Sequence, residues 1–454
     1  MTHAPYTRLM TTRLLANSKD RLSAAAGEGS PVVVALTGLA ALAVAMGIGR
    51  FAFTPVLPMM QAEMRLSVAA AGWLASANYV GYLLGALTAI WIPLAPQLVI
   101  RLALVAIGIA TLGMGFTASF AAWVALRALA GIASAWVLVF VSAWCLERLT
   151  SVARPRLVSV VYAGVGSGIT AAGGLCFILM RQRATSADAW IALGAVSFGA
   201  TALIWRVLGR RASCATTSAP AAGRMSATWD GEGLRLVLCY GAWGFGYIIP
   251  ATFLPAMARE MVRDPKVFGL AWPIFGMASA AATLGAGRLG KVVENRRLWA
   301  SSHVMMAIGV ILPSIFPGIV AVMCAALLVG SAFMVATMTG LQEARHVYGA
   351  GAKPLMAAMT AAFALGQILG PVAVSSFTDT GTAVDKALVA AALVLLVSAY
   401  ALRSPRSVND RETMSFDEHA RASRRADHDD RTYAAPSRAA MHSTRDQHRS
   451  EGLS

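Results

Sequence analysis

Charged residues are scarce in this chain of 454 residues. Asp, Glu, Lys and Arg together make up 13% of it, against about 25% in an ordinary soluble domain. Apolar residues make up 57%, and they form long runs. Runs of 18 or more apolar residues predict membrane-spanning helices. The composition therefore excludes an ordinary soluble globular protein. It also excludes a transmembrane β-barrel, whose strands would alternate apolar and polar residues.

Cysteine and catalytic motifs are also lacking. Of the five cysteines, four lie inside apolar runs and Cys214 lies in a polar stretch, so neither a disulfide framework nor a metal site is predicted. The chain has no GxxxxGK[ST] loop for nucleotide phosphates, no HExxH motif and no nucleophile elbow. We therefore expect no enzymatic activity, no cofactor, no metal and no direct use of ATP.

Twelve apolar stretches, separated by prolines and charges, predict an all-α membrane protein with twelve transmembrane helices. The predicted spans are 31–57, 66–92, 97–115, 119–146, 157–180, 187–208, 234–258, 267–287, 298–316, 318–342, 354–377 and 384–402.

Lysine and arginine are distributed unequally between the two sides of these spans. With the N-terminus in the cytoplasm, 29 lie in cytoplasmic segments and 7 in outward loops. The positive-inside rule then predicts that both termini are cytoplasmic, and it accounts for the net charge of +16 without a nucleic-acid partner. Residues 1–30 form a cytoplasmic N-terminal segment and 209–233 a cytoplasmic linker. Residues 403–454, without an apolar run, are expected to form a disordered cytoplasmic tail.

The two halves of the chain repeat. Met46–Glu63 and Trp243–Glu260 are identical at six positions with an offset of 197 residues. Two further matches follow in the same order, Gly164 and Gly168 with Gly366 and Gly370, and Gly131 with Gly330. The repeat predicts two parallel six-helix bundles, residues 31–208 and 234–402, with a binding site between them near the middle of the membrane.

Several motifs point to a known family. The stretch RALAGIASA (127–135) resembles the span-4 motif of the major facilitator superfamily, and GQILGP (366–371) resembles its Gly/Pro-rich antiporter motif. Over residues 31–402 the chain resembles that superfamily, and GIGRFAFTPVLPMMQAEMRLSVAAAGWLASANYVGYLLGAL (47–87) resembles its YbfB/YjiJ-like bacterial subgroup. The resemblance implies the major facilitator fold, a monomer in the bacterial inner membrane, and alternating access around a cavity lined by spans 1, 4, 7 and 10.

The loop between spans 2 and 3 departs from the family pattern. It reads IPLAPQLVIR (92–101), without the usual Gly…Asp-Arg…Gly-Arg sequence, and the equivalent after span 8 survives as GRLGK (287–291). The first half therefore lacks the aspartate of the lock that usually closes the inner side in this family.

Two arginines, Arg50 and Arg127, lie deep within apolar runs. A charge at such depth costs roughly 2.5–3.5 kcal/mol on insertion scales and usually has a function. None of the 22 acidic residues lies mid-membrane, and Glu343, near the inner end of span 10, is the nearest candidate. A guanidinium binds a carboxylate or phosphate through two hydrogen bonds, so the pair predicts an anion-binding site. Alternatively, Arg127 bonds backbone carbonyls or serves proton transfer.

Further candidate ligands are aromatic or polar. Tyr240, Trp243 and Tyr247 share one face of span 7, and Tyr247 is the repeat equivalent of Arg50. Asn78, Tyr82 and Gln367 are also substrate-binding candidates, for which a lipid-facing or interfacial position is the alternative. Small residues that let helices approach closely at moving interfaces are Gly81, Gly85, Gly131, Gly164, Gly168, Gly366, Gly370 and Pro371.

These features together favour a secondary transporter for a small organic anion, with the solute and the lipid bilayer as its partners and any coupling ion undetermined. A proton-coupled exporter of drugs or metabolites is the alternative within transport. A transporter-like receptor or scaffold that acts through its tail is the alternative outside it.

Overall fold

The computed structural model describes residues 30–151, 154, 156–209, 231–261, 265–290, 292–316, 318–375 and 383–403. Most of the predicted N-terminal segment, linker and tail lies outside these ranges. The first predicted span is built from three consecutive pieces: α2 (Pro31–Leu42), the π-helix η1 (Ala43–Arg50) and α3 (Phe53–Met64). The first half continues with α4 (Val68–Thr88), α5 (Pro96–Phe116), α6 (Phe120–Ser151), α7 (Arg156–Arg181) and α8 (Ser186–Gly209).

The second half has the same order of long helices. It contains α9 (Gly231–Met261), α10 (Pro265–Leu289), α11 (Asn295–Ile315), α12 (Ile319–Tyr348), the 3-10 turn η2 (Gly349–Gly351), α13 (Ala352–Ser375) and α14 (Ala383–Arg403). Twelve long helical segments thus follow one another in the described residues, at the places where the apolar runs predicted them. Nine of them are long and apolar enough to cross a membrane by length and composition, and α4, α9 and α10 are not among these nine.

Local sequence signals set several of the helix ends. Pro31 and Pro96 occupy the first turns of α2 and α5, where the missing N–H costs nothing. The Ser67 hydroxyl accepts a hydrogen bond from the Ala70 N–H at 3.1 Å and caps α4. The ends of α6 and α12 lie several residues beyond the predicted spans. An apolar run marks the part of a helix in lipid, and the polar turns that follow it remain helical.

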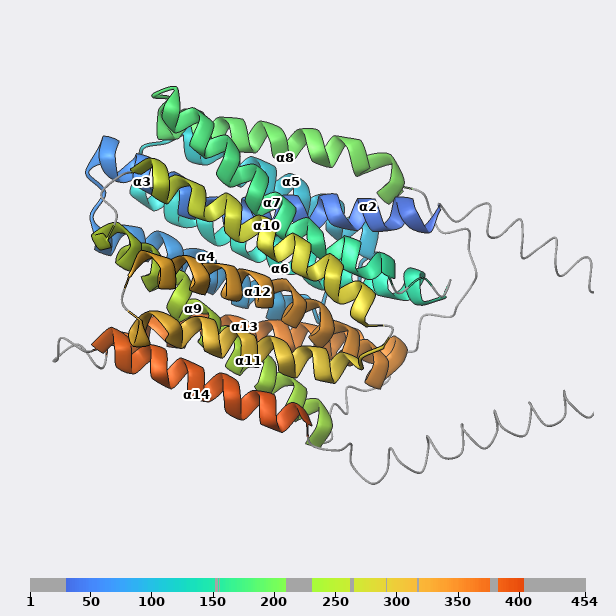
Figure 1. Ribbon diagram of the computed structural model, residues 1–454. Helices are drawn as coiled ribbons and strands as arrows, with labels where there is room; N and C mark the ends of the chain where they lie inside the picture. The colour runs from blue at the N-terminus through green and yellow to red at the C-terminus, as the bar shows by residue number, and fades with distance from the viewer. Residues whose placement is uncertain are drawn as a thin grey trace, which may run out of the picture. The chain divides into compact units, whose positions relative to one another are not determined.

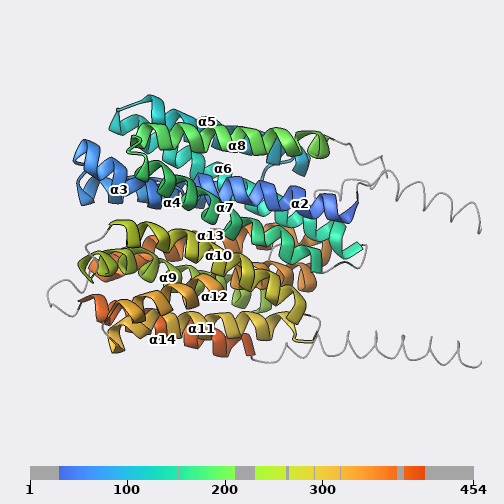
Figure 2. The same cartoon turned by 45° about the horizontal axis from the view of Figure 1, so that its top comes forward.

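The helices pack into two groups, one from each half. In the first half α4 packs on α6 and α5 on α8, while in the second α9 packs on α13, and α11 on α12 and α14. The halves meet along two helix pairs, α7 with α10 and α4 with α13. Both views of the ribbon show α10 running beside α7 (Figure 1, Figure 2). The fold is that of two parallel six-helix bundles, as the repeat predicted.

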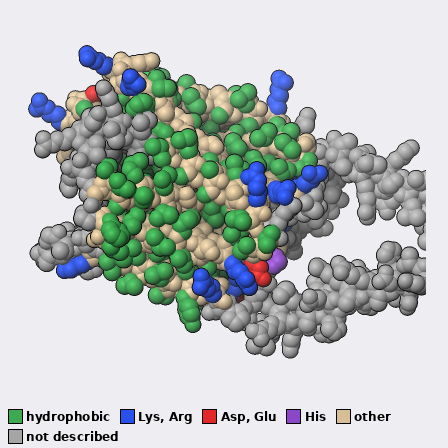
Figure 3. Space-filling model, in the orientation of Figure 1, with side chains coloured by type: hydrophobic (Ala, Val, Ile, Leu, Met, Phe, Trp, Pro, Cys, Tyr) green, Lys and Arg blue, Asp and Glu red, His purple; other side chains and the backbone are tan. Residues whose placement is uncertain are grey.

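The outer surface of the helices is apolar. Leu203 is 83% exposed, and Trp73 and Val397 are 69% exposed. On the face drawn in Figure 3, hydrophobic side chains cover the middle of the helices, while lysines and arginines gather at the two ends. A contiguous apolar surface between two charged ends is typical of a protein whose helices are surrounded by lipid.

Candidate functional site

Arg50 ends the π-helix η1 and is buried at 3% exposure. A π-helix widens the turn and occurs frequently at functional sites. The side chain lies among aromatic rings, because the guanidinium carbon is 3.8 Å from the centroid of Tyr82, 5.4 Å from Tyr79 and 5.9 Å from Phe363. Cation–π contacts of this kind stabilise a desolvated cation without neutralising it.

One hydrogen bond links Arg50 to the other half of the molecule. Its Nη2 donates to Oε1 of Gln367 on α13. Among the described residues, Nε and Nη1 of Arg50 have no hydrogen-bond partner, and Arg50 forms no ion pair there. Buried polar groups normally find partners, so two nitrogens of a buried cation remain able to bind an acceptor.

Other buried polar atoms beside Arg50 are also unsatisfied. Within the part of the chain that the structure describes, this holds for Nε2 of Gln367, for the Tyr82 hydroxyl, and for Nε1 of Trp243, whose ring stacks on Phe363 next to Arg50. Two of these three atoms only donate, and the hydroxyl can do either. Together with Arg50 they form a site rich in donors, which suits a ligand rich in acceptors.

Arg127 has a different environment. Its Nε donates to the carbonyl of Leu74 at 3.5 Å, and its Nη1 and Nη2 donate to the carbonyls of Gly49 and Arg50, each at 3.4 Å. Its guanidinium also lies 4.7 Å from the Phe53 ring. All three nitrogens are therefore occupied by backbone, which is the alternative role that the sequence left open for this residue.

Asn78 supports the same segment of backbone. Its Nδ2 donates to the carbonyl of Arg127 at 3.0 Å and to that of Gly49 at 3.5 Å. Gly49 and Arg50 lie at the end of η1, where the helical hydrogen-bond pattern changes. Arg127 and Asn78 thus hold the turn that carries Arg50, and of Arg50 and Arg127 only Arg50 has nitrogens without a hydrogen-bond partner among the described residues.

The predicted aromatic stripe on α9 lies in the same region. Trp243 stacks on Tyr247, with ring centroids 5.8 Å apart, and on Phe363 of α13, at 4.4 Å. Phe333 of α12 stacks on Tyr247 at 4.5 Å. Tyr240 is 5.8 Å from Phe363. Phe363 therefore contacts both the stripe and the surroundings of Arg50, and these rings form one aromatic wall.

All eight predicted substrate-binding residues are buried in the protein, at 4% exposure or less: Arg50, Asn78, Tyr82, Arg127, Tyr240, Trp243, Tyr247 and Gln367. Five of them lie at or next to the donor-rich site: Arg50, Tyr82, Trp243, Tyr247 and Gln367. Arg127 and Asn78 instead donate hydrogen bonds to backbone carbonyls of the neighbouring helices. Sequence reasoning missed Phe51, Tyr79, Phe333 and Phe363. Phe363 could have been found, because it precedes Gln367 by four residues and so shares its face of α13.

The predicted small residues pack helices within each half. A methyl group on Gly81, Gly85 or Gly131 would overlap with the backbone of the facing helix in the α4–α6 pair. Gly164 and Gly168 lie in the same way against α2 and η1, and Gly366 against α9, while a methyl group on Gly370 would overlap with the side chain of Ile248 of α9. We expected these positions at the moving interface between the halves, and their place inside the halves corrects that expectation. The side chain of Pro371 lies outside the described residues.

The interface between the halves uses other residues. Gly166 of α7 and Gly276 of α10 face one another so closely that neither could carry a side chain. The Thr170 hydroxyl donates to the carbonyl of Pro273 at 3.4 Å. At the end of the helices that carries Pro31, Ile92 and Lys353, here called the inner end, Nζ of Lys353 donates to the carbonyl of Ile92 at 3.3 Å. This lysine of α13 also lies 4.3 Å from the centroid of Phe140 on α6.

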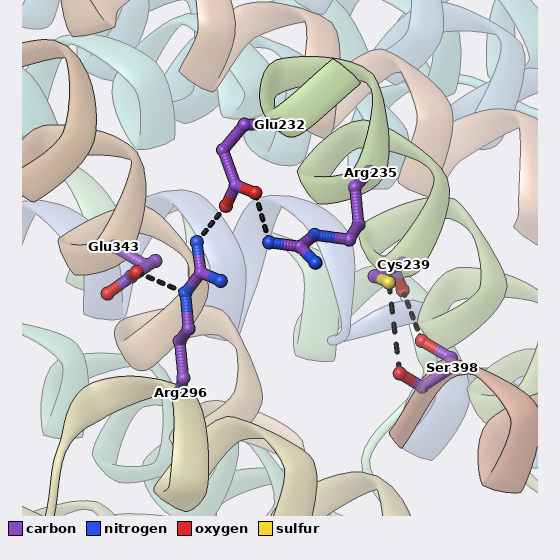
Figure 4. Close-up of polar contacts among 6 residues, drawn as sticks. All are labelled: Glu232, Arg235, Cys239, Arg296, Glu343 and Ser398. Carbon is purple, nitrogen blue, oxygen red and sulfur yellow. Dashed lines mark hydrogen bonds and ion pairs between the residues drawn. The ribbon is translucent and has the colours of Figure 1, made fainter. Parts of the chain in front are cut away.

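A buried charge cluster lies at the inner end of the second half (Figure 4). Arg296 of α11 donates to Glu343 of α12 at 2.6 Å through Nε, and to Glu232 of α9 through Nη2. Arg235 donates to the other oxygen of Glu232. Two glutamates and two arginines thus join the ends of three helices, so Glu343, the acidic residue that the sequence offered as the nearest candidate for the membrane interior, is ion-paired.

Comparison with known proteins agrees with this fold. The sequence model of the family described as "Uncharacterised MFS-type transporter YbfB" matches residues 42–403. No curated protein matches the chain. Among solved structures, the fold is similar to that of the human organic anion transporter MFSD10 (TETRAN), with a TM-score of 0.63 and 15% sequence identity over 82% of this chain and 98% of that one. The chain therefore belongs to the YbfB family of MFS-type transporters, and it is a multi-pass membrane protein.

Proposed function

We propose that this protein is a secondary active transporter of the bacterial inner membrane that moves a small organic anion by alternating access. One observation carries the proposal: a buried guanidinium, Arg50, sits between the two halves with two nitrogens that have no acceptor among the described residues. A buried charge without a partner is strongly unfavourable. An anion bound at Arg50 would remove that cost, and it would bridge the halves that must move against one another.

The surroundings of Arg50 narrow the class of anion. Aromatic faces from Tyr82, Trp243 and Phe363 favour a flat or apolar body next to the charge. The unsatisfied atoms are mainly donors, so an additional ammonium group on the solute would find few acceptors. We therefore expect a monocarboxylate with an aromatic or otherwise apolar body, in preference to a zwitterion or a sugar. The similar fold belongs to a protein named as an organic anion transporter, which is consistent with this class.

The proton-coupled exporter has less support. Among the described residues, the buried glutamates Glu232 and Glu343 are paired with Arg296 at one end of the second half. A carboxylate held in this way is not available to a cationic drug in the centre of the molecule.

The test is uptake into proteoliposomes of benzoate, of its neutral amide and of acetate as a small carboxylate. We expect saturable uptake of benzoate, weak uptake of acetate and none of the amide. Arg50→Ala should weaken benzoate binding about ten- to a hundredfold, because a hydrogen bond to a charged group contributes about 1.5–3 kcal/mol. Arg50→Lys keeps the charge but loses the planar fork, so some uptake should survive.

The matched control is Arg206→Ala, which removes an exposed arginine in the last turn of α8 and should leave uptake unchanged. An Arg50→Ala protein that carries benzoate with wild-type affinity would show that Arg50 is structural. Transport of the amide as readily as of benzoate would favour a neutral substrate.

A further inference from the structure

The hydrogen bond between Arg50 and Gln367 joins opposite halves of the transporter. Arg50 belongs to the first span and Gln367 to α13, and both side chains are buried, at 3% and 0% exposure. The bond lies where the halves also meet through Tyr82 and Phe363, whose ring centroids are 6.4 Å apart. It can therefore form only when the two halves are close together around the site.

We infer that Gln367 is an internal counter-ligand for Arg50, which allows the transporter to close and reorient without a bound anion. The inference rests on the proposed function, because it assumes that an anion binds Arg50. If Gln367 has this role, the protein can move the solute in one direction, in addition to exchanging one solute molecule for another.

The physical reason is the cost of closing the protein around a bare guanidinium. A carrier whose arginine has an acceptor only when the anion is bound can close only when loaded, so it exchanges. The Gln367 carbonyl oxygen supplies an acceptor from the protein itself, and the rings of Tyr79 and Tyr82 add cation–π contacts. The unloaded protein can therefore also bury Arg50.

The hydrogen bond between Arg50 and Gln367 is weak enough for a bound anion to replace it. A neutral amide forms a weaker bond to guanidinium than a carboxylate does, so an incoming anion displaces Gln367. A glutamate at this position would pair permanently with Arg50 and compete with the solute. A leucine would offer no acceptor. In the described chain Nε2 of Gln367 has no partner, so the amide has a donor available for a carboxylate at Arg50.

Two assays on purified protein in proteoliposomes separate the modes. Net uptake of benzoate is measured into vesicles that contain no anion, and exchange is measured into vesicles preloaded with unlabelled benzoate. We expect the wild-type protein to perform both. Gln367→Leu should lower net uptake about ten- to a hundredfold while exchange at saturating benzoate stays near the wild-type rate, because the lost Nε2 donor lowers only the benzoate affinity and the lost bond to Arg50 matters only when no anion is bound. Gln367→Glu should weaken benzoate binding in both assays.

Gln97→Leu is the control, since Gln97 is half-buried in the first turn of α5 and should change neither rate. Gln367→Met gives a second variant without an acceptor if the leucine protein does not fold. Equal rates for net uptake and exchange in both variants, or an equal loss of both, would overturn the inference while leaving the anion site intact. Exchange without net uptake by the wild-type protein would also overturn it. Absence of benzoate transport in either assay would contradict the proposed function itself.

Discussion

The two halves of the molecule bury arginine in opposite ways. In the second half, Arg296 lies between two carboxylates, those of Glu232 and Glu343, at the inner end of three helices. In the first half, Arg50 lies among aromatic rings with an amide from the other half as its one hydrogen-bond partner among the described residues. Both residues are less than 10% exposed.

The difference indicates which buried charge holds the structure and which one is available to a ligand. A buried ion pair of good geometry satisfies its own members, and removing one of them leaves the others uncompensated. A buried cation without an acid raises the free energy of the folded protein and persists where function requires it. We therefore expect Arg296 to stabilise the scaffold, and Arg50 is the proposed ligand of the anion.

The largest expected effect is on stability, at Arg296. Arg296→Met leaves Glu232 and Glu343 buried with their main partner removed, so the free energy of unfolding should fall by about 3–5 kcal/mol. Thermal unfolding of the detergent-solubilised protein measures the change. By contrast, Arg50→Ala removes a poorly compensated charge and should not lower the unfolding temperature.

The neighbouring residue provides the control. Arg297 is 75% exposed and pairs with the equally exposed Glu294 at 3.5 Å, so Arg297→Met should change stability by no more than about 1 kcal/mol. Restoring neutrality with Arg296→Met and Glu343→Gln together, which leaves Glu232 paired with Arg235, should recover much of the loss. The contrast between the halves would be wrong if Arg296→Met lowered the stability no more than Arg297→Met does. It would also be wrong if Arg50→Ala lowered the stability as much as Arg296→Met does.

The order and position of the helices were predictable, because the thickness of the membrane sets the length of an apolar run. The depth of Arg50 was predictable for the same reason. Its partners were harder to predict, because lipid-facing and core-facing positions are both apolar and periodicity then says little about which face points inward. Phe333 and Phe363 were missed in this way.

The burial of Arg296 could not be predicted from the sequence, for a second reason. Arg296 was counted among the cytoplasmic charges, yet the structure buries it inside the inner end of the second half. Its partners lie 64 and 47 residues away in the chain, and nothing in the local sequence indicates that they meet. The π-helix at Ala43–Arg50 was likewise not predicted, because its carbonyls depend on donors from Arg127 and Asn78 on other helices.

The second largest effect on stability is expected at Arg127, and it distinguishes Arg127 from Arg50 within the first half. Arg127→Met removes the donors to the carbonyls of Leu74, Gly49 and Arg50, and buried acceptors left without partners should cost about 1–3 kcal/mol. Because its nitrogens donate to backbone carbonyls, we expect this side chain to position η1 without binding the solute, so the maximal rate of benzoate uptake should fall more than the apparent affinity.

Separate measurement of KM and maximal rate distinguishes the two arginines. Arg127→Lys retains one donor and should restore part of the rate, whereas Arg50→Lys should remain deficient mainly in affinity. An Arg127→Met protein whose affinity falls as far as that of Arg50→Ala would make Arg127 a direct ligand, as the paired arginines first suggested.

The smallest effect is expected at Lys353, a cation that joins the halves through a carbonyl and a ring. Lys353→Met removes the bond to Ile92 and the contact with Phe140, in a chain that lacks the usual aspartate at this inner loop. A partly exposed contact of this kind contributes about 0.5–1 kcal/mol. The inner end should therefore open about two- to fivefold more often, since 1.4 kcal/mol corresponds to about tenfold.

Opening is measured as the rate at which a thiol reagent labels Ala143→Cys, one turn from Phe140, in a background without the five native cysteines. Arg345→Met is the matched control, because Arg345 donates to the carbonyl of Gly349 at 2.7 Å within the second half alone. Lys353→Met should accelerate labelling and Arg345→Met should not, since a contact inside one half moves with that half. Equal labelling rates in both variants would show that Lys353 does not hold the halves together, and the closure of the inner end would then depend on the packing of helices from the two halves, such as α7 against α10 and α4 against α13.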